Sequence, residues 1–247
     1  MDNKIRIQKI IADSGYCSRR KAEAYIESAQ VKLNGRPVKL GDKANPHKDI
    51  ITINGEKINS GKKMRYIKLY KPRGYQCTNA DPHAKKLITE LLKSIPERLY
   101  PVGRLDVSSE GLILLTNDGE FANRITHPKN GIKKTYRVTV PHEVTEDKAL
   151  LMKDGLDIGD GEITQPCVVE IVSADKERSI LRITISEGKN RQIRRMCEVA
   201  GLKVSRLKRV SVGGVKLGML KPGEHAELTE GELRLLNYGK DNKRRKI

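Results

Sequence analysis

Hydrophobic residues near the start of the chain recur with a helical period. The four isoleucines between residues 5 and 11 fall on one face of a helix, which the Asp-Ser-Gly sequence at 13–15 ends. Ser18 is suited to cap a second helix. Short apolar stretches with Asn-Gly turns follow at 31–38 and 50–55. The pattern predicts a small module of two helices followed by hairpins.

The pattern becomes richer in strands after residue 63. The predicted strands lie at 66–70, 111–115, 135–140, 168–172, 180–185 and 204–210, and the predicted helices at 87–92, 121–125, 146–153, 191–200 and 230–236. Thr229 and Glu232 have the spacing of a capping box at the start of the last helix. Because crossover helices do not separate the strands regularly, the sequence predicts an α+β fold.

These patterns divide the chain into parts with different roles. We expect a first domain at 1–59, a polar linker at 60–63 and a larger domain at 64–239. Residues 240–247 carry five lysines and arginines and are expected to form a disordered basic tail. No internal repeat is visible.

The charge of the chain predicts its class of partner. The 247 residues include 49 Lys and Arg against 31 Asp and Glu, which gives a formal net charge of +18. Such an excess is typical of proteins that bind nucleic acid through its phosphates. Aromatic residues make up only 4% of the chain and tryptophan is absent, so broad base stacking is not the expected mode. The remaining expected mode is recognition of the shape and the phosphates of RNA.

Other classes of function lack their sequence signals. The longest apolar runs are far shorter than the roughly 18 residues that cross a bilayer. The N-terminus lacks a secretory signal, so we expect a cytoplasmic protein. The four cysteines stand 60, 90 and 30 positions apart, and neither they nor the five histidines have metal-ligand spacing. We therefore expect neither a disulfide framework nor a bound metal.

The second predicted helix begins with Arg19, Arg20 and Lys21. Positive charges there oppose the helix dipole, and a bound phosphate would relieve this conflict. The basic helix followed by Val-Lys-Leu-Asn-Gly at 31–35 resembles the S4 family of RNA-binding domains over about residues 4–58. The resemblance implies that these three residues contact structured RNA. The alternative is an ordinary helical hairpin with a solvated charged face.

Asp106 stands in the most informative segment, at 103–119, where the sequence reads GRLDVSSEGLILLTNDG. From the residues alone, Asp106 has two interpretations. It either caps a turn by accepting backbone hydrogen bonds, as loop aspartates commonly do, or it is a functional carboxylate presented by a strand.

Three segments resemble motifs of the RsuA-type pseudouridine synthases, which modify bacterial ribosomal RNA and carry an N-terminal S4 domain. They are residues 103–119, the sequence LYKPRG at 69–74 and the sequence GKNRQIRRM at 188–196. The resemblance covers nearly the whole chain. It implies a catalytic domain built on a mixed, mainly antiparallel sheet flanked by helices.

The resemblance also implies roles for individual residues. Asp106 is the catalytic aspartate, Arg194 its partner, and Tyr136 the residue that stacks on the target uracil, while Arg104 helps to hold the flipped nucleotide. A carboxylate can attack ribose or base, or take a C2′ proton, and the sequence does not choose among these. A guanidinium keeps such a carboxylate ionised. The reaction needs no redox change or phosphoryl transfer, so no cofactor is expected.

Basic residues cluster around this presumed site. Residues 188–209 hold eight Lys and Arg against one acid. The further candidates for RNA contact are Lys71, Lys189, Asn190, Arg191, Gln192 and Arg195. The alternatives are a solvated charged surface for these residues, core packing for Tyr136, and a structural role for Lys71 at the end of its strand.

The sequence thus predicts an enzyme that isomerises one uridine of bacterial ribosomal RNA, with large-subunit RNA favoured and small-subunit RNA or tRNA possible. The high charge favours a monomer. The alternative from another class is a non-catalytic RNA-binding factor for ribosome assembly or quality control. A serine hydrolase using Ser108 or Ser109 is a weaker alternative, because the chain has no G-x-S-x-G elbow.

Overall fold

The computed structural model of the chain describes residues 4–58, 63–78 and 86–236. The chain forms two compact units. Unit 1 comprises residues 1–65 with two short segments at 96–98 and 117–119, and unit 2 comprises the remainder. Most of the predicted linker and all of the predicted basic tail at 240–247 lie outside the described residues.

Unit 1 consists of two helices and short strands around one core. The helices are α1 (Ile7–Asp13) and α2 (Arg19–Glu27), and the strands are β1 (Ile5–Arg6), β2 (Val31–Leu33), β3 (Arg36–Pro37), β4 (Lys43–Ala44), β5 (Ile51–Ile53) and β6 (Glu56–Lys57). Strands β3, β2, β5 and β6 form one sheet in that order, and β1 pairs with β4. Ile5 was predicted to be helical, but it lies in β1 because Ile5 and Arg6 pair with Ala44 and Lys43. The helix therefore starts at Ile7.

The start of α2 has the predicted cap and an exposed basic turn. The Ser18 hydroxyl accepts a hydrogen bond from the backbone N–H of Lys21 at 3.2 Å, which confirms the cap. Arg19, Arg20 and Lys21 are all exposed, while Ile26 on the opposite side is buried in the unit's core. The basic side chains thus stand at the surface of unit 1.

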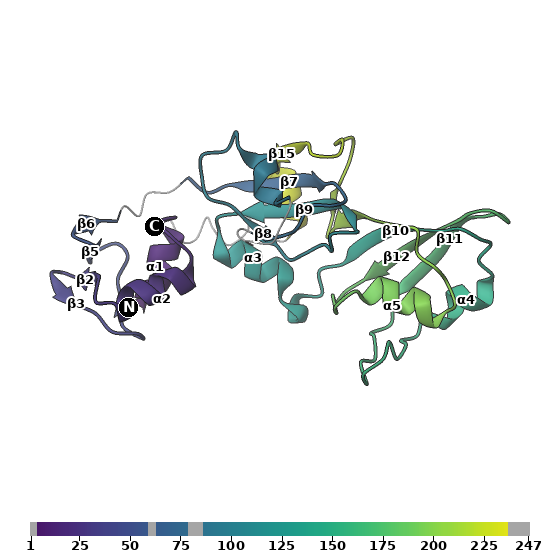
Figure 1. The fold of residues 1–247 in the computed structure, drawn as a ribbon, viewed down its shortest axis with the longest axis horizontal. Helices are drawn as coiled ribbons and strands as arrows, with labels where there is room; N and C mark the ends of the chain where they lie inside the picture. Colours follow the sequence, from purple (N-terminus) through teal and green to yellow (C-terminus); the bar gives the residue numbers. More distant parts are fainter. Residues whose placement is uncertain (1–3, 59–62, 79–85, 237–247) are drawn as a thin grey trace. The chain divides into compact units, whose positions relative to one another are not determined.

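Unit 2 is built on a nine-stranded sheet that contains all six predicted strands (Figure 1). The strands are β7 (Tyr66–Lys71), β8 (Tyr100–Val102), β9 (Glu110–Thr116), β10 (Lys134–Val140), β11 (Val168–Ala174), β12 (Ser179–Ile185), β13 (Arg206–Val212), β14 (Val215–Lys216) and β15 (His225–Glu227). The main path runs β11-β12-β10-β13-β9-β7-β15, and β8 and β14 pair with β9 and β13. Among the strands described in this sheet, β9 and β13 alone pair in parallel. The mixed, mainly antiparallel sheet and the α+β class are confirmed.

Helices cover the two faces of this sheet. They are η1 (Ile88–Leu92), α3 (Gly119–Thr126), η2 (Pro128–Asn130), α4 (Glu146–Leu151), α5 (Gln192–Val199) and α6 (Glu230–Leu235). All five predicted helical segments form, although η1 is a 3-10 helix. The predicted capping box at Thr229 and Glu232 is present at α6. Alternate residues of β9 enter different cores: Ile113 packs in the cluster that includes α5, and Leu112 in the cluster that includes α3. Strand β9 is therefore buried along its whole length.

Gly111 permits the close approach of β9 and β13. It has a φ of +105° and lies opposite Arg209 in the parallel pairing. A Cβ atom at this position would stand 2.7 Å from the backbone nitrogen of Arg209. Glycine is therefore required here by both the backbone conformation and the space.

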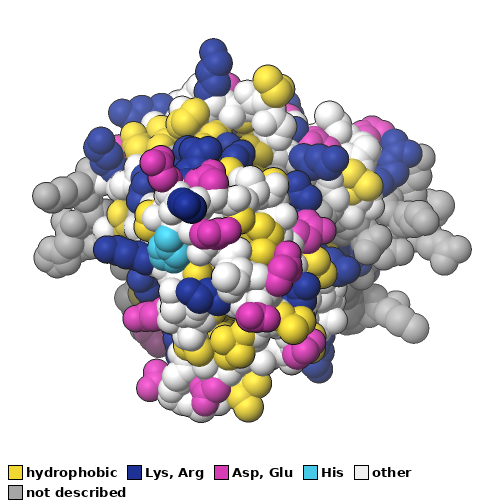
Figure 2. Space-filling view, turned by 90° about the vertical axis from the view of Figure 1, so that its right-hand side faces the viewer, with side chains coloured by type: hydrophobic (Ala, Val, Ile, Leu, Met, Phe, Trp, Pro, Cys, Tyr) yellow, Lys and Arg dark blue, Asp and Glu magenta, His cyan; other side chains and the backbone are white. Residues whose placement is uncertain are grey.

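The end of unit 2 that carries α4, α5, β11 and β12 has a mixed surface. Figure 2 shows basic, acidic and hydrophobic side chains interspersed on this face. The ion pair of Arg182 on β12 with Glu170 on β11, at 3.0 Å, belongs to this mixture. This face therefore does not present a patch of a single charge. None of the described helices is long and apolar enough to cross a membrane.

Candidate active site

One face of the sheet supplies the floor of the candidate site. Tyr136 on β10 lies directly opposite Ile183 on β12 and Arg209 on β13. Residues directly opposite each other in neighbouring strands project to the same face. Tyr136 is 8% exposed and belongs to the hydrophobic core. Tyr136 therefore both packs in the core and lines the candidate site.

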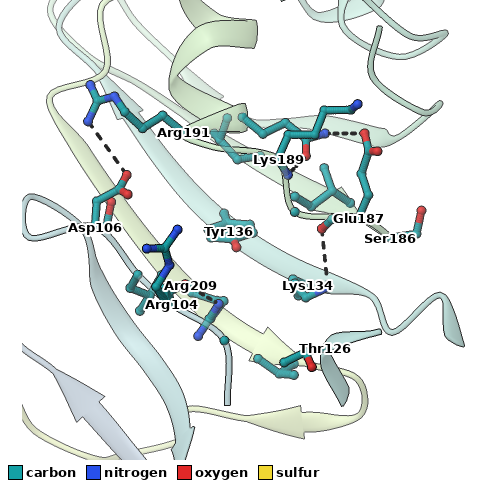
Figure 3. A pocket seen from close by; sticks show the side chains of 18 of the residues that line it. Arg104, Asp106, Thr126, Lys134, Tyr136, Ser186, Glu187, Lys189, Arg191 and Arg209 are labelled. Carbon is teal, nitrogen blue, oxygen red and sulfur yellow. Dashed lines mark hydrogen bonds and ion pairs between the residues drawn. The ribbon is translucent and has the colours of Figure 1, made fainter. Parts of the chain in front are cut away.

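A cavity of about 220 Å³ lies above this floor. Among its lining residues are Arg104, Asp106, Lys134, Tyr136, Lys189, Arg191, Gln192 and Arg209. In Figure 3, Tyr136 lies in the middle of the site, with Asp106 and Arg104 on one side and Lys134 on the other. A cavity of about 150 Å³ can hold one benzene ring. The space is thus suited to a single substituted six-membered ring.

Asp106 is carried by the loop at 103–109 between β8 and β9, here called the Asp106 loop. The backbone N–H of Ser109 donates to the carbonyl of Asp106 at 3.0 Å, which closes a turn. The backbone N–H of Gly74 donates to the carbonyl of Val107 at 2.8 Å and ties the loop to the end of β7. These contacts fix the backbone that presents the carboxylate.

Lys71 supports the Asp106 loop from within the protein. Its side chain has no exposed surface, and Nζ donates to the carbonyls of Ser109 at 2.7 Å and Pro72 at 3.0 Å. Burial lowers the pKa of Lys71. The prediction that Lys71 contacts RNA is therefore wrong, because the ammonium group is fully enclosed. The alternative, that Lys71 shapes the end of its strand, is confirmed.

Two arginines lie close to the Asp106 carboxylate. Arg191 Nη1 lies 3.9 Å from Asp106 Oδ2, and the Asp106 side chain is 36% exposed. Arg194 instead donates through Nη2 to the carbonyl of Ser108 at 3.3 Å. The ion pair that Asp106 makes in the structure is thus with Arg191, which stands at the N-cap of α5 with a φ of +48°. The role of Arg194 as the partner of Asp106 stays a prediction.

The charges around Asp106 affect one another. Burial lowers the pKa of Arg194, and the positive charge of Arg191 lowers it further, whereas the Asp106 carboxylate acts in the opposite direction. Arg191 thus lies beside the Asp106 carboxylate, and Arg194 contacts the loop that carries it.

The loop before α5 is organised by Gln192. This side chain is 3% exposed: its Oε1 accepts from the backbone N–H of Lys189 at 3.0 Å, and Nε2 donates to Glu187 at 2.8 Å. The amide of Gln192 is therefore used inside the loop, and its predicted RNA contact stays a prediction. Lys189 and Arg191 line the cavity, and Asn190 is exposed beside them. Their RNA contacts stay predictions.

Arg195 also has a structural role where RNA contact was predicted. Its Nε donates to the carbonyl of Ile158 at 2.8 Å, and Nη2 donates to the carbonyl of Gly159 at 2.9 Å. Nη1 pairs with Glu162. The guanidinium therefore contacts the segment at 158–162. The predicted RNA contact by Arg195 stays a prediction.

Arg209 lies at the site although its sequence segment does not single it out. It counted only as one of eight basic residues, yet it is 3% exposed and lines the cavity. Nε donates to the carbonyl of Leu112 at 2.7 Å and Nη1 to that of Arg104 at 3.5 Å. The signal that could have found it is the period-2 spacing with buried Leu207, which puts a charged residue on an apolar strand face.

A buried carboxylate behind the site ties β9 to β13. Glu110, whose side chain is 6% exposed, pairs with Arg206 and accepts a hydrogen bond from the Tyr70 hydroxyl at 3.0 Å. Burial alone would raise the pKa of Glu110, but the hydrogen bonds from Arg206 and Tyr70 outweigh it and lower that pKa. The ionised form of Glu110 therefore stabilises the folded protein.

Replacing Glu110 by Gln should lower stability in a pH-dependent way. We expect a cost of about 1–2 kcal/mol near neutral pH, because one charge-assisted hydrogen bond is weakened. A carboxylate whose pKa is lower in the folded than in the unfolded protein stabilises the folded state. This stabilisation is complete above the pKa of the unfolded state, about 4.3, and is lost as the pH falls through the pKa of the folded state. The difference in melting temperature between wild type and E110Q should thus shrink below about pH 4.3. The exposed Glu177→Gln variant is the control, and an E110Q difference that is constant with pH would contradict this assignment.

Comparisons with known proteins agree with the geometry of both units. Residues 5–50 match the S4 domain family, and residues 65–199 match the RNA pseudouridylate synthase family. The two units thus combine an S4 domain with the fold of an enzyme that isomerises uridine in RNA. The chain belongs to the RNA pseudouridylate synthase family. This membership supports the enzyme and not the alternative of a non-catalytic RNA-binding factor.

Relatives with the same organisation span nearly the whole chain. The chain is 42% identical to the ribosomal large subunit pseudouridine synthase B of Bacillus subtilis, over 96% of this chain and 98% of that protein. It is 39% identical to the dual-specificity RNA pseudouridine synthase RluF of Escherichia coli, over 94% of this chain and 78% of that protein. A crystal structure of a pseudouridylate synthase is similar with a TM-score of 0.69 and 34% identity, covering 94% and 99% of the two chains.

Proposed function

We propose that this protein converts one uridine of ribosomal RNA to pseudouridine, with large-subunit RNA as the favoured substrate. The observation that carries the proposal is that Asp106 and Tyr136 line one ring-sized cavity in a member of this family. The likeness to a Bacillus subtilis enzyme named for the large ribosomal subunit supports the choice of RNA. We further propose that the protein works as a monomer in the cytoplasm, where ribosomes are assembled.

The side chains divide the chemistry among them. The target base must leave its stack to enter the cavity, and Tyr136 offers a flat surface on the cavity floor for the uracil. Asp106 breaks the bond between ribose C1′ and uracil N1, by attack on ribose or base or by taking the C2′ proton. Arg191 places a positive charge 3.9 Å from the carboxylate, and Arg194 holds the Asp106 loop through the carbonyl of Ser108. Arg104, exposed at the cavity, holds the displaced nucleotide.

RNA is recognised chiefly by electrostatic contacts. We propose that residues 1–59 form a docking domain, in which the basic turn of α2 grips phosphates, and that residues 64–239 form the catalytic domain. Arg19, Arg20 and Lys21 are exposed together at a helix N-terminus, where phosphate is favoured. Lys189 and Arg191 offer further positive charge at the cavity, and Asn190 stands exposed beside them.

Replacing Arg19, Arg20 and Lys21 together by Gln should weaken RNA binding. Each phosphate contact that is lost reduces the slope of log K against log salt by roughly 0.7–0.9, so the slope should fall by roughly 2–3 in total. Filter binding or fluorescence anisotropy between 50 and 200 mM salt, roughly the range over which such contacts are felt, measures this slope. A matched loss of charge at the exposed residues Lys39, Lys48 and Lys57 is the control. Equal losses in both triple variants would contradict a specific docking role for α2.

The proposed function is tested by mapping pseudouridine in unmodified ribosomal RNA. After incubation with the protein, carbodiimide adducts that stop reverse transcription mark each converted uridine. We expect one stop in large-subunit RNA. Small-subunit RNA and tRNA are tested in parallel, because the relative in Escherichia coli is described as dual-specific. A protein that binds these RNAs tightly but produces no stop in any of them would contradict the proposal.

A further inference from the structure

The floor of the cavity contains one hydrogen-bond donor that the protein leaves unused. Arg209 Nη2 is buried and has no hydrogen-bond partner among the described residues. The other nitrogens of this guanidinium are held by the carbonyls of Leu112 and Arg104. Lys134, the neighbouring buried cation, already donates to the carbonyls of Ile132 at 3.1 Å and Glu187 at 3.4 Å. A buried donor without a hydrogen-bond partner destabilises the protein, so a partner is expected from outside the chain.

The position of this donor suits a contact with the target base and not with the RNA backbone. Arg209 and Tyr136 are directly opposite each other on β13 and β10, on one face of the sheet. A ring that stacks on Tyr136 therefore has an edge toward Arg209. Phosphates of a flipped nucleotide remain at the rim of a site, whereas Arg209 is 3% exposed. Arg104, exposed and next to Arg209 in Figure 3, is the side chain that can move aside when the base enters.

We propose that Arg209 Nη2 donates a hydrogen bond to a carbonyl oxygen of the target uracil and so selects this base. The inference rests on the proposed function and states how the target base is recognised in the same cavity. Uracil has carbonyl oxygens at C2 and at C4, whereas cytosine carries an amino group at C4. A fixed donor favours an oxygen and disfavours an amino group at the same place.

The same donor suits the base before and after its rotation. Isomerisation exchanges N1 for C5 at the ribose, which a half-turn of uracil about the line through N3 and C6 achieves. This half-turn also exchanges the two carbonyl oxygens. An arginine fixed by two backbone carbonyls therefore meets an acceptor in the substrate and again in the rotated base. In cytosine, the half-turn would exchange an oxygen for an amino group and break the contact.

The experiment compares RNA substrates that differ only in the target base. The wild-type protein is assayed on an RNA fragment with uridine, 2-thiouridine or 4-thiouridine at the target, and product nucleosides are separated by chromatography. Sulfur is a much weaker hydrogen-bond acceptor than oxygen. We expect kcat/KM to fall roughly tenfold for at least one thio-substrate. Equal kcat/KM for all three substrates would overturn the proposal, independently of any variant.

Two variants separate recognition of the base from support of the loop. Arg209→Met removes the donor, and Arg209→Lys keeps a charge that can still reach a backbone carbonyl. In both variants kcat/KM on uridine should fall, and the penalty for sulfur should shrink to about twofold or less, because the hydrogen bond is already absent. A sulfur penalty unchanged from wild type would mean that Arg209 only supports the Asp106 loop. If the wild type converts no uridine at all, the proposed function itself fails, and this inference with it.

Discussion

Replacement of Asp106 by Asn is expected to reduce turnover at least about a thousandfold, which corresponds to about 4 kcal/mol of transition-state stabilisation. The amide has nearly the shape of the carboxylate but can neither attack nor accept a proton as readily. Because the Asp106 loop is fixed by Lys71 and by the Gly74 backbone, the change should not disturb the fold. Single-turnover conversion of the mapped uridine measures the loss.

Binding of RNA separates this effect from a structural one. The D106N variant should bind RNA within about twofold of wild type, because the changed side chain is small and partly exposed. Ser108→Ala is a control in the same loop, since Ser108 offers its backbone carbonyl to Arg194, and this carbonyl is retained. Normal turnover by D106N would show that another group performs the chemistry.

Replacement of Gly111 by Ala should cause the largest loss of stability among these variants. The added methyl group would meet the backbone of Arg209, and a φ of +105° is unfavourable for alanine. We expect a cost of about 3 kcal/mol, from the combined effects of crowding and backbone strain. For a chain of this size, the melting temperature should fall by roughly 6–12 °C.

Gly223→Ala is the matched control for this prediction. Gly223 has a similar φ of +89°, but an added methyl group would meet only the Leu91 side chain at 3.8 Å, an ordinary contact. This variant should therefore show the cost of backbone strain without that of crowding. Equal melting temperatures for the two variants would contradict the close approach of β9 and β13. Because Gly111 lies opposite Arg209, the first variant should also lose activity.

The sequence predicted most regular elements because each has a long enough pattern. Strands β9 and β10 have seven residues each and show clear apolar runs or alternation. Strand β15 was missed, since its three residues, His225–Glu227, are too few for a period to be seen and include no large apolar side chain. Ile5 was misplaced because pairing with Ala44, distant in sequence, decides its conformation. Such pairing leaves no local signal.

The sequence predicted which residues form the candidate site better than it predicted the contacts that they make. The family resemblance located Asp106 and Tyr136, and both line the cavity. Residue type does not tell whether a cation faces solvent or a backbone carbonyl, and this is why the carbonyl contacts of Lys71 and Arg195 were not predicted. Arg209 was overlooked for the opposite reason, since it stands among many basic residues and only its period-2 spacing from Leu207 marks it as buried.

The pairing of β15 with β7 has a consequence for biosynthesis. Strand β7 begins unit 2, whereas β15 is the last strand of the unit to be translated. One edge of β7 therefore stays without its partner while the rest of the unit emerges from the ribosome. Open strand edges are templates for association between chains. Completion of this edge of the sheet must therefore wait until β15 has been synthesised.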